Sequence, residues 1–209
     1  MKSETNMYEI EERLHGEGDE LIAGVDEAGR GPLAGDVYAA AVILDKNNPI
    51  DGLNDSKKLS EKKREELFDE ITKKALAYSV CSVSAERIDE INILNATFEA
   101  MNNAVDSLKI TPDFVIIDGN RIKNMQISHE TIVKGDAKSA SIAAASILAK
   151  VSRDRYMTKM AKLYPCYNFE KHKAYGTKEH RELIEKFGPC PIHRKTFKGV
   201  KEYVKKADG

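Results

Sequence analysis

Two adjacent acidic residues close an apolar run near the start of the chain. Asp26 and Glu27 end the run that begins at Leu21, and the triplet Gly29-Arg30-Gly31 follows almost at once. Neighbouring carboxylates repel each other, so a cation, a hydrogen-bond donor or solvent must compensate them. Simple capping of a loop calls for one acid and not for two. This stretch is therefore the first candidate for chemistry.

Two further acids stand at expected element boundaries. Asp118 follows the apolar run 114–117, and Asp136 precedes a long alanine-rich segment, where we expect it to be the N-cap of a helix. Each acid alone has an ordinary explanation as a turn or cap residue. Carboxylates with few His or Cys neighbours otherwise suit hard cations, and two such ions about 4 Å apart activate water for phosphodiester hydrolysis. The residues alone leave both interpretations open.

The composition excludes several classes of protein. A chain of 209 residues with 41% hydrophobic and 32% charged residues fits one globular domain, with at most a small appendage. No stretch approaches the roughly 20 apolar residues of a membrane span, and the acid-rich N-terminus lacks the apolar region of a signal peptide. Cys81, Cys166 and Cys190 are a poor disulfide framework. We therefore expect a cytoplasmic protein without membrane association.

The net charge of −1 hides an uneven distribution. Residues 1–29 hold nine acids against two basic residues, whereas residues 171–209 hold eleven Lys and Arg against five acids. A basic C-terminal part beside an acid-lined strand end is compatible with a polyanion held near metal ions. Charge alone, however, favours the simpler interpretation of a solvated helical surface.

Hydrophobic spacing predicts the elements that position these residues. Strands are expected at 21–26, 37–44, 77–84 and 114–117, with a weaker one at 127–134, and the short glycine-containing loop between the first two predicts an antiparallel pair. Helices are expected after an N-cap at Ser60, over 88–108 with unbroken three-and-four spacing, over 138–164, over 178–187 and near 199–206. The small side chains of the third helix would let it pack closely on a sheet. This order gives a mixed α/β domain.

Six long motifs, in order, resemble one protein family. They are GVDEAGRGPLAG (24–35), LNDSKKLSEKKRE (53–65), DFVIIDGN (113–120), IVKGDAKSASIAAASILAKVSRD (132–154), FEKHKAYGTKEH (169–180) and GPCPIHRKTF (188–197). On these motifs the chain resembles ribonuclease HII, the type 2 bacterial ribonuclease H. The resemblance implies an α/β, ribonuclease H-like fold: a mixed five-stranded sheet flanked by helices, with a helical C-terminal extension. The expected parts are an acidic leader (1–20), a catalytic domain (21–163) and the extension (164–209).

The resemblance also implies an activity. Members of the family cut the RNA strand of RNA–DNA hybrids and nick duplex DNA on the 5′ side of a single embedded ribonucleotide, leaving 3′-hydroxyl and 5′-phosphate ends. The four family acids that bind two Mg²⁺ or Mn²⁺ ions correspond to Asp26, Glu27, Asp118 and Asp136. We therefore expect cations, and not Arg30, to compensate the first two. A monomer is expected, and the tail KEYVKKADG gives no support for a sliding-clamp partner.

The glycine-flanked loop and one tyrosine are the expected determinants of substrate choice. Backbone groups of Gly29, Arg30 and Gly31 would recognise the 2′-hydroxyl, because glycine lets a backbone approach a ligand closely. The Arg30 side chain would donate toward phosphate. Tyr175 corresponds to the family tyrosine that stacks at the RNA-to-DNA junction; its alternative is a core or turn aromatic.

A second group of residues is expected to hold backbone phosphates. Ser56, Lys57 and Lys58 lie in a loop before a helix, where a hydroxyl and two ammonium groups would bind phosphate; solvated lysines are the alternative. Lys150, Arg153 and the basic tail would add contacts that are independent of sequence and sensitive to salt.

Three competing hypotheses remain to be weighed. Ribonuclease HIII carries a lysine between the loop glycines and an extra N-terminal domain, so Arg30 and the short leader argue against it. A non-catalytic nucleic-acid-binding module would not need all four acids. A zinc protein is disfavoured because the spacings match no common zinc pattern, and we expect its candidate ligands to be surface or substrate-facing groups. Those ligands are Cys166, His172, His180, Cys190 and His193.

Overall fold

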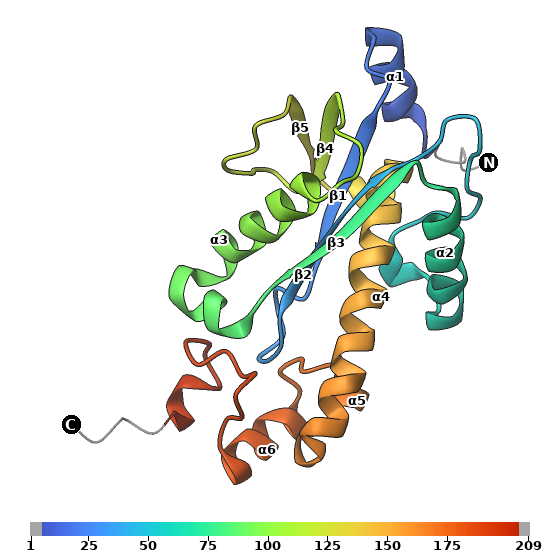
Figure 1. Ribbon diagram of the computed structural model, residues 1–209. Coiled ribbons are helices and arrows are strands. Elements are labelled where there is room, and N and C mark those ends of the chain that lie inside the picture. The colour runs from blue at the N-terminus through green and yellow to red at the C-terminus, as the bar shows by residue number, and fades with distance from the viewer. Residues whose placement is uncertain (1–5, 205–209) are drawn as a thin grey trace.

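A computed structural model describes residues 6–204 and places a five-stranded sheet at the centre of the molecule (Figure 1). The strands are β1 (Ile22–Ala28), β2 (Val37–Ile43), β3 (Ala77–Val83), β4 (Phe114–Asp118) and β5 (His129–Ile132). Their order in the sheet is β3-β2-β1-β4-β5. β2 is antiparallel to β1 and to β3, whereas β4 is parallel to β1 and to β5. The predicted mixed sheet and the predicted antiparallel first pair are both confirmed.

Helices cover both faces of the sheet and extend past its end (Figure 1). They are α1 (Glu9–Glu17), α2 (Glu61–Lys74), α3 (Ala85–Asp106), α4 (Ala140–Leu163), α5 (Phe169–His172) and α6 (Lys178–Phe187). Short 3₁₀ turns lie at Ser56–Lys58, Gly135–Ala137, Pro165–Tyr167 and Lys201–Tyr203. The predicted N-cap of α2 is confirmed, because the Ser60 hydroxyl accepts from the Lys63 amide. The segment after α4 is the predicted helical C-terminal extension.

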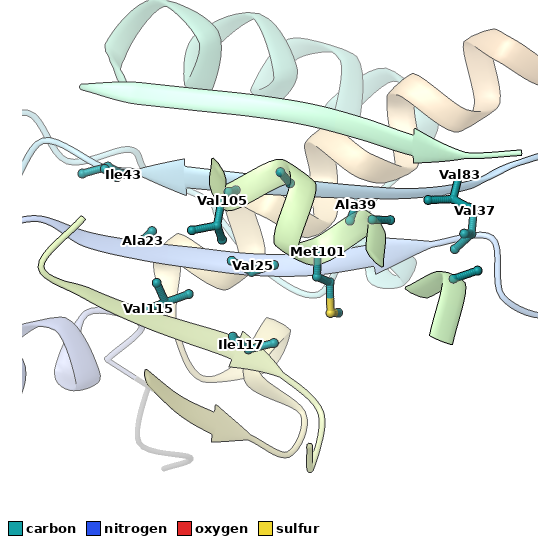
Figure 2. Close-up of a cluster of buried hydrophobic side chains, with 14 of the residues drawn as sticks. Ala23, Val25, Val37, Ala39, Ile43, Val83, Met101, Val105, Val115 and Ile117 are labelled. Carbon is teal, nitrogen blue, oxygen red and sulfur yellow. The ribbon is translucent and has the colours of Figure 1, made fainter. Parts of the chain in front are cut away.

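The alternation of side chains along β2 divides the core into two layers. Ala39 faces α3, where Met101 and Val105 pack near it (Figure 2), and Ala41 belongs to the same buried cluster. Ala40 and its even-numbered neighbours face α4 and α2 on the other side. The alanines of β2 keep both helices close to the sheet.

Helix α4 lies in backbone contact with β1. A Cβ atom on Gly24 would lie 2.1 Å from the Ser141 carbonyl carbon, a distance that no side chain tolerates. The first turns of α4 carry mainly Ala and Ser, all buried. The predicted close packing of this helix is therefore confirmed, and it sets the helix start directly behind the acid-bearing strand.

Helix α3 departs from its predicted unbroken spacing. Asn92 has φ 66° and ψ 162°, which are not helical values, and its side chain accepts from the amides of Leu94 and Asn95. The asparagine thus ends one helical segment and caps the next. Ile91 and Leu94, on either side of this break, are only partly buried.

Two predictions about helix ends are wrong. Asp136 lies in a 3₁₀ turn, and the N-cap of α4 is Ser139, whose hydroxyl accepts from the Ile142 amide at 3.1 Å. The tail helix expected near 199–206 reduces to the turn Lys201–Tyr203 within the described residues, and residues 205–206 lie outside them.

Helix α1, within the acidic leader, packs on the sheet. Its Leu14 is 1% exposed and contacts Ile22 of β1 and Ile142 of α4. The carboxylate of Glu11 accepts from the Ser139 hydroxyl and the Ser141 amide at the start of α4. Within residues 6–204, no helix has the length and apolar character needed to cross a membrane.

Candidate active site

Parallel pairing brings the four predicted acids to one edge of the sheet. β1 and β4 run side by side with Val25 opposite Ile117, so Asp26 and Asp118 follow at matching ends of neighbouring strands. One oxygen of Asp118 accepts from the Gly135 amide at 2.6 Å, which draws in the turn that carries Asp136. The structure therefore places all four predicted acids in one neighbourhood.

These carboxylates are poorly solvated and repel one another. Asp26 is 5% exposed and accepts from the Glu27 amide at 2.7 Å. Burial, followed by the charges of Glu27 and Asp118, raises the pKa of Asp26 well above its usual range. Burial also raises the pKa of Glu27, and burial with Asp118 raises that of Asp136. The cluster holds more negative charge than its surroundings favour.

Two basic side chains face the cluster without neutralising it. The Arg30 guanidinium lies 3.3 Å from a Glu27 oxygen, so this arginine does pair with one of the two adjacent acids. Half of the Arg30 side chain is exposed, however, and such a pair contributes little. Burial opposes the charge of Lys57, but the nearby carboxylates of Asp136 and Asp26 raise its pKa above the usual value. Within residues 6–204, Asp26, Asp118 and Asp136 form no salt bridge.

The donor set fits a hard divalent cation bound in an open site. All four candidate ligands are carboxylates, the donors that Mg²⁺ and Mn²⁺ prefer. In the part of the chain from residue 6 to 204, no three Asp, Glu, His or Cys side chains form a ready-made cage around one ion. Mg²⁺ commonly binds through one or two carboxylates and completes its shell with water and substrate phosphates. The arrangement suits ions shared with a phosphodiester.

A cavity of about 230 Å³ opens over three of these acids. It brings together β1, the loop after it, the 3₁₀ turn before α2, helix α4 and the C-terminal extension. Most of the predicted substrate-binding residues line it, whereas Lys58 is exposed outside it. The lining residues are Asp26, Glu27, Ala28, Gly29, Arg30, Gly31, Ser56, Lys57, Asp118, Ser146, Lys150 and Tyr175.

The two loop glycines are required for different reasons. Gly29 has φ +96°, and a Cβ there would lie 2.2 Å from the Nε of Arg153, so this position needs glycine for its own backbone. At Gly31, a Cβ would meet only the Tyr175 ring, at 3.7 Å. The second glycine leaves the backbone open toward the cavity, as the close-approach hypothesis expects.

Tyr175 is a surface residue of the cavity and not a core aromatic. Its side chain is exposed, at 45%, and the Arg153 guanidinium lies 5.8 Å from the ring centroid. Its backbone is fixed, because its amide donates to the His172 carbonyl. The ring is therefore held at its base and free to stack.

The turn Ser56–Lys58 is held in place from beneath. The Ser56 hydroxyl is buried and lies 3.0 Å from the Ser146 hydroxyl of α4. Asp55 caps the turn by accepting from the Lys57 amide. Of the three predicted phosphate ligands, the two lysines are exposed, whereas the serine joins the turn to α4.

Arg153 is not a phosphate contact, contrary to the sequence-based prediction. It is 1% exposed, and its guanidinium donates to the carbonyls of Ala34, Asp36 and Lys173 at 3.3–3.4 Å. Lys150 lines the cavity as expected, although it also pairs with Asp154 at 2.7 Å. The sequence analysis did not identify Ser146 as a site residue. Its hydroxyl on an otherwise apolar helix face could have indicated one.

The candidate zinc ligands lie mostly in the core of the extension. His180, His193 and His172 are 0%, 1% and 9% exposed, so their expected place at the surface is wrong. Their rings pack around Phe169. Cys166 is exposed, and within residues 6–204 these side chains form no group of three that could hold a metal ion. These residues build the extension.

Comparison with known proteins finds one matching family. The family model described as Ribonuclease HII matches residues 23–200. Ribonuclease HII of Caldicellulosiruptor bescii is 59% identical over 197 residues, which cover 94% of this chain and 96% of the relative.

Two solved structures are also similar to the chain. The ribonuclease H2 of Pyrococcus horikoshii superposes with a TM-score of 0.74 at 29% identity, covering 88% of this chain and 97% of that one. The RNase HII from Archaeoglobus fulgidus, solved in complex with PCNA, gives a TM-score of 0.74 at 26% identity, covering 86% and 96%.

Proposed function

We propose that this chain, which belongs to the ribonuclease HII family and is therefore a metal-dependent ribonuclease H, cuts the RNA strand of RNA–DNA hybrids and nicks duplex DNA on the 5′ side of a single ribonucleotide. The products carry 3′-hydroxyl and 5′-phosphate ends. One observation carries the proposal: three of the four acids, the glycine-flanked loop and Tyr175 meet at a single cavity. The activity would serve removal of ribonucleotides from DNA during replication and repair in the cytoplasm.

Asp26, Glu27, Asp118 and Asp136 would hold two divalent ions, Mg²⁺ or Mn²⁺. When bound, such ions supply an activated water and stabilise the leaving oxygen of the phosphodiester. The protein fixes its own part beforehand, because backbone amides of Glu27 and Gly135 already orient the carboxylates of Asp26 and Asp118. The energetic cost of bringing these acids together is met before substrate arrives.

The loop and the tyrosine would select the position of the cut. Gly31 presents open backbone beside the Tyr175 ring, so a 2′-hydroxyl can be recognised by backbone groups without any sequence preference. The ring would then pack on the deoxyribose at the RNA-to-DNA junction, where a 2′-hydroxyl would obstruct it. Arg30 would hold the neighbouring phosphate when it exchanges Glu27 for substrate.

Basic side chains around the cavity would bind the duplex backbone. Lys57, Lys58 and Lys150 carry ammonium groups at or near the cavity rim, and such contacts act on any sequence and weaken with salt. We propose action as a monomer. The PCNA complex is described for the Archaeoglobus fulgidus relative, and the tail of this chain carries no convincing clamp-binding motif, so we assign it no clamp partner.

Cleavage of a long RNA–DNA hybrid tests the metal-dependent chemistry. The wild type should cut in Mg²⁺ or Mn²⁺ and lose all cutting in excess chelator. Asp118→Asn should lose at least about a hundredfold in rate, because a lost cation ligand removes several kcal/mol of charge stabilisation. Asp69→Asn, on the exposed face of α2, is the matched control and should cut normally. Undiminished activity in chelator, or binding of the hybrid without any cutting, would refute the proposal.

A further inference from the structure

A buried arginine of the C-terminal extension donates to the backbone of the loop after β1. Arg194 is 0% exposed. Its Nε donates to the Gly35 carbonyl at 2.9 Å, and its Nη1 to the carbonyls of Arg30 and Pro32, both at 2.9 Å. Its Nη2 donates to the Gly29 carbonyl at 2.6 Å. One side chain thus holds four carbonyls of a seven-residue segment, 29–35, which lies about 160 residues away in sequence.

Backbone hydrogen bonds hold the far end of the same loop. The Arg194 amide donates to the Leu33 carbonyl at 2.9 Å, and the Gly35 amide donates to the Ile192 carbonyl at 2.8 Å. The Leu33 amide in turn donates to Ala174 of the extension. These bonds fix residues 33–35, but among residues 29–31 the carbonyls of Gly29 and Arg30 depend on the Arg194 side chain.

Burying the Arg194 charge is costly unless hydrogen bonds or an opposite charge compensate it. Within residues 6–204, Arg194 forms no salt bridge, and an apolar side chain would fill the same volume at lower cost. Burial, and then the charge of Arg153, lowers the pKa of Arg194 to about 9, so the guanidinium stays protonated near neutral pH. A planar cation with five N–H donors suits a set of convergent carbonyls. The buried guanidinium is therefore compensated by the loop carbonyls, and in turn it fixes their direction.

The direction of the carbonyls determines the direction of the amides. In a trans peptide the C=O and N–H groups point opposite ways, and the residues described contain no cis peptide. Because the Gly29 and Arg30 carbonyls point at Arg194, the amides of Arg30 and Gly31 point away from it. Among residues 6–204, neither amide has a hydrogen-bond partner, and both residues line the cavity. Two unpaired donors therefore stand beside the acid cluster.

We infer that Arg194 is a positioning residue, which turns the Arg30 and Gly31 amides toward the cavity so that they donate to the 2′-oxygen of the ribonucleotide. The inference rests on the proposed function, because it assigns a device to the recognition step of that same site. It predicts that ribonucleotide recognition depends on a side chain that never touches substrate.

Binding of uncut duplexes tests this role. In an Asp118→Asn background, the dissociation constant is measured in Mg²⁺ for a duplex with one ribonucleotide and for the all-DNA duplex of the same sequence. Adding Arg194→Lys keeps the charge but loses the fork of donors, so the preference for the ribonucleotide should fall about tenfold, the worth of about one hydrogen bond. Affinity for the all-DNA duplex should change by no more than about twofold, since phosphate contacts remain.

A matched control is Arg155→Lys, an exposed arginine of α4 that contacts Phe68 and Glu65 on α2. It should leave both affinities unchanged. Hydrogen exchange of the free protein gives an independent readout: Arg194→Lys should speed exchange in peptides covering 29–35 and not in β2 or β3.

Each outcome bears on a different claim. A parent protein without any ribonucleotide preference would refute the proposed recognition of the 2′-hydroxyl, while the exchange data would still judge whether Arg194 orders the loop. A preference retained in a folded Arg194→Lys protein would overturn the inference. Arg194→Gln, which keeps a planar end group, is the second variant if lysine prevents folding. Loss of the thermal transition in both would also overturn it, by showing that Arg194 supports the whole fold.

Discussion

At the scale of single residues, the site concentrates charge that the folded chain does not favour. Asp26 is buried beside Glu27 and Asp118, and these surroundings raise its pKa. A carboxyl group whose pKa is raised by folding is ionised more easily in the unfolded chain, so its ionisation at neutral pH lowers the free energy of unfolding. The destabilisation is absent below the unfolded-state pKa and grows as pH rises through the folded-state pKa. Function and stability therefore oppose each other at this position.

The variant Asp26→Asn separates these two effects. Without metal at pH 7, it should raise the thermal midpoint above that of the wild type, and the gain should shrink as pH falls through the unfolded-state pKa of about 4, below which Asp26 is protonated in both states. Cleavage of the hybrid should fall by at least about a hundredfold, as expected for a lost cation ligand. Calorimetry and a cleavage assay measure the two effects. A lower midpoint at pH 7 would contradict the account of the cluster, and Asp69→Asn controls for loss of a surface charge.

At the scale of elements, the acid-bearing strand and helix α4 are fixed by backbone contact. Gly24 has no room for a Cβ because the Ser141 backbone lies against it. β1 therefore cannot move toward this face without displacing the start of α4. That start follows the turn with Asp136 and is capped by Ser139. The spacing of β1 and α4 thereby sets the distance between acids that come from different segments.

Gly24→Ala should destabilise the protein by about 2 kcal/mol or more, in the range of severe overpacking, because backbone and not a flexible side chain stands in the way. Its matched control is Gly16→Ala in α1, where a Cβ meets nothing within 4 Å. That change should be neutral or stabilise by up to about 1 kcal/mol. Urea unfolding measures both. Equal stability of the two variants would show that the sheet and helix are not in such close contact.

The C-terminal extension contains a chain of neutral imidazoles that ends at Tyr175. His193 accepts from the Cys190 amide at Nδ1, so its Nε2 carries the proton and donates to Nε2 of His180 at 3.1 Å. Nδ1 of His180 then donates to the Tyr175 carbonyl at 3.0 Å. Burial lowers the pKa of His180 to about 4, and burial with the nearby His180 lowers that of His193 to about 4. Both must stay unprotonated for the chain to persist.

This chain predicts acid sensitivity with a definite sign. A histidine whose pKa is lowered by folding stabilises fully above its unfolded value of about 6.5 and loses that contribution as pH falls toward 4. Each of the two histidines can lower the free energy of unfolding by at most about 1.4 kcal/mol per pH unit in this window. Carboxylates such as Asp26 act in the opposite direction, so the measurement is a difference: His193→Gln should flatten the fall in unfolding free energy between pH 6.5 and 4.5, whereas the exposed His129→Gln should not. Parallel curves for wild type and His193→Gln would contradict the assignment.

At the scale of the whole molecule, the sheet and the extension complete one site together. The sheet supplies Asp26, Glu27 and Asp118, and the extension supplies Tyr175 and the side chain that holds the loop. The expected division near residue 164 stays a proposal, and its two sides share the cavity. Helix α1 is joined to the same body through Leu14 and Glu11.

Sequence reasoning predicted what depends on local pattern and missed what depends on contacts between distant segments. Apolar runs located all five strands, and adjacent carboxylates indicated the site, because strand ends and charge repulsion can be recognised in a short stretch. The cap of α4 was assigned to Asp136 and not Ser139, since both precede the helix and only the backbone geometry decides. The sequence did not indicate that Arg153 and Arg194 are buried and hold the backbone of other segments. An arginine in a basic segment has the same pattern whether it faces solvent or carbonyl groups.

The most direct test of the central claim is the position of the cut in a duplex with one ribonucleotide. An end-labelled duplex is incubated with the full-length protein in Mg²⁺ and in Mn²⁺, beside the all-DNA duplex of the same sequence, and the nick and its ends are mapped on a sequencing gel. The account predicts a single nick immediately 5′ of the ribonucleotide, with 3′-hydroxyl and 5′-phosphate ends, and an intact all-DNA duplex. Cutting of the all-DNA duplex, or an uncut single-ribonucleotide duplex from protein that cuts long hybrids, would contradict it.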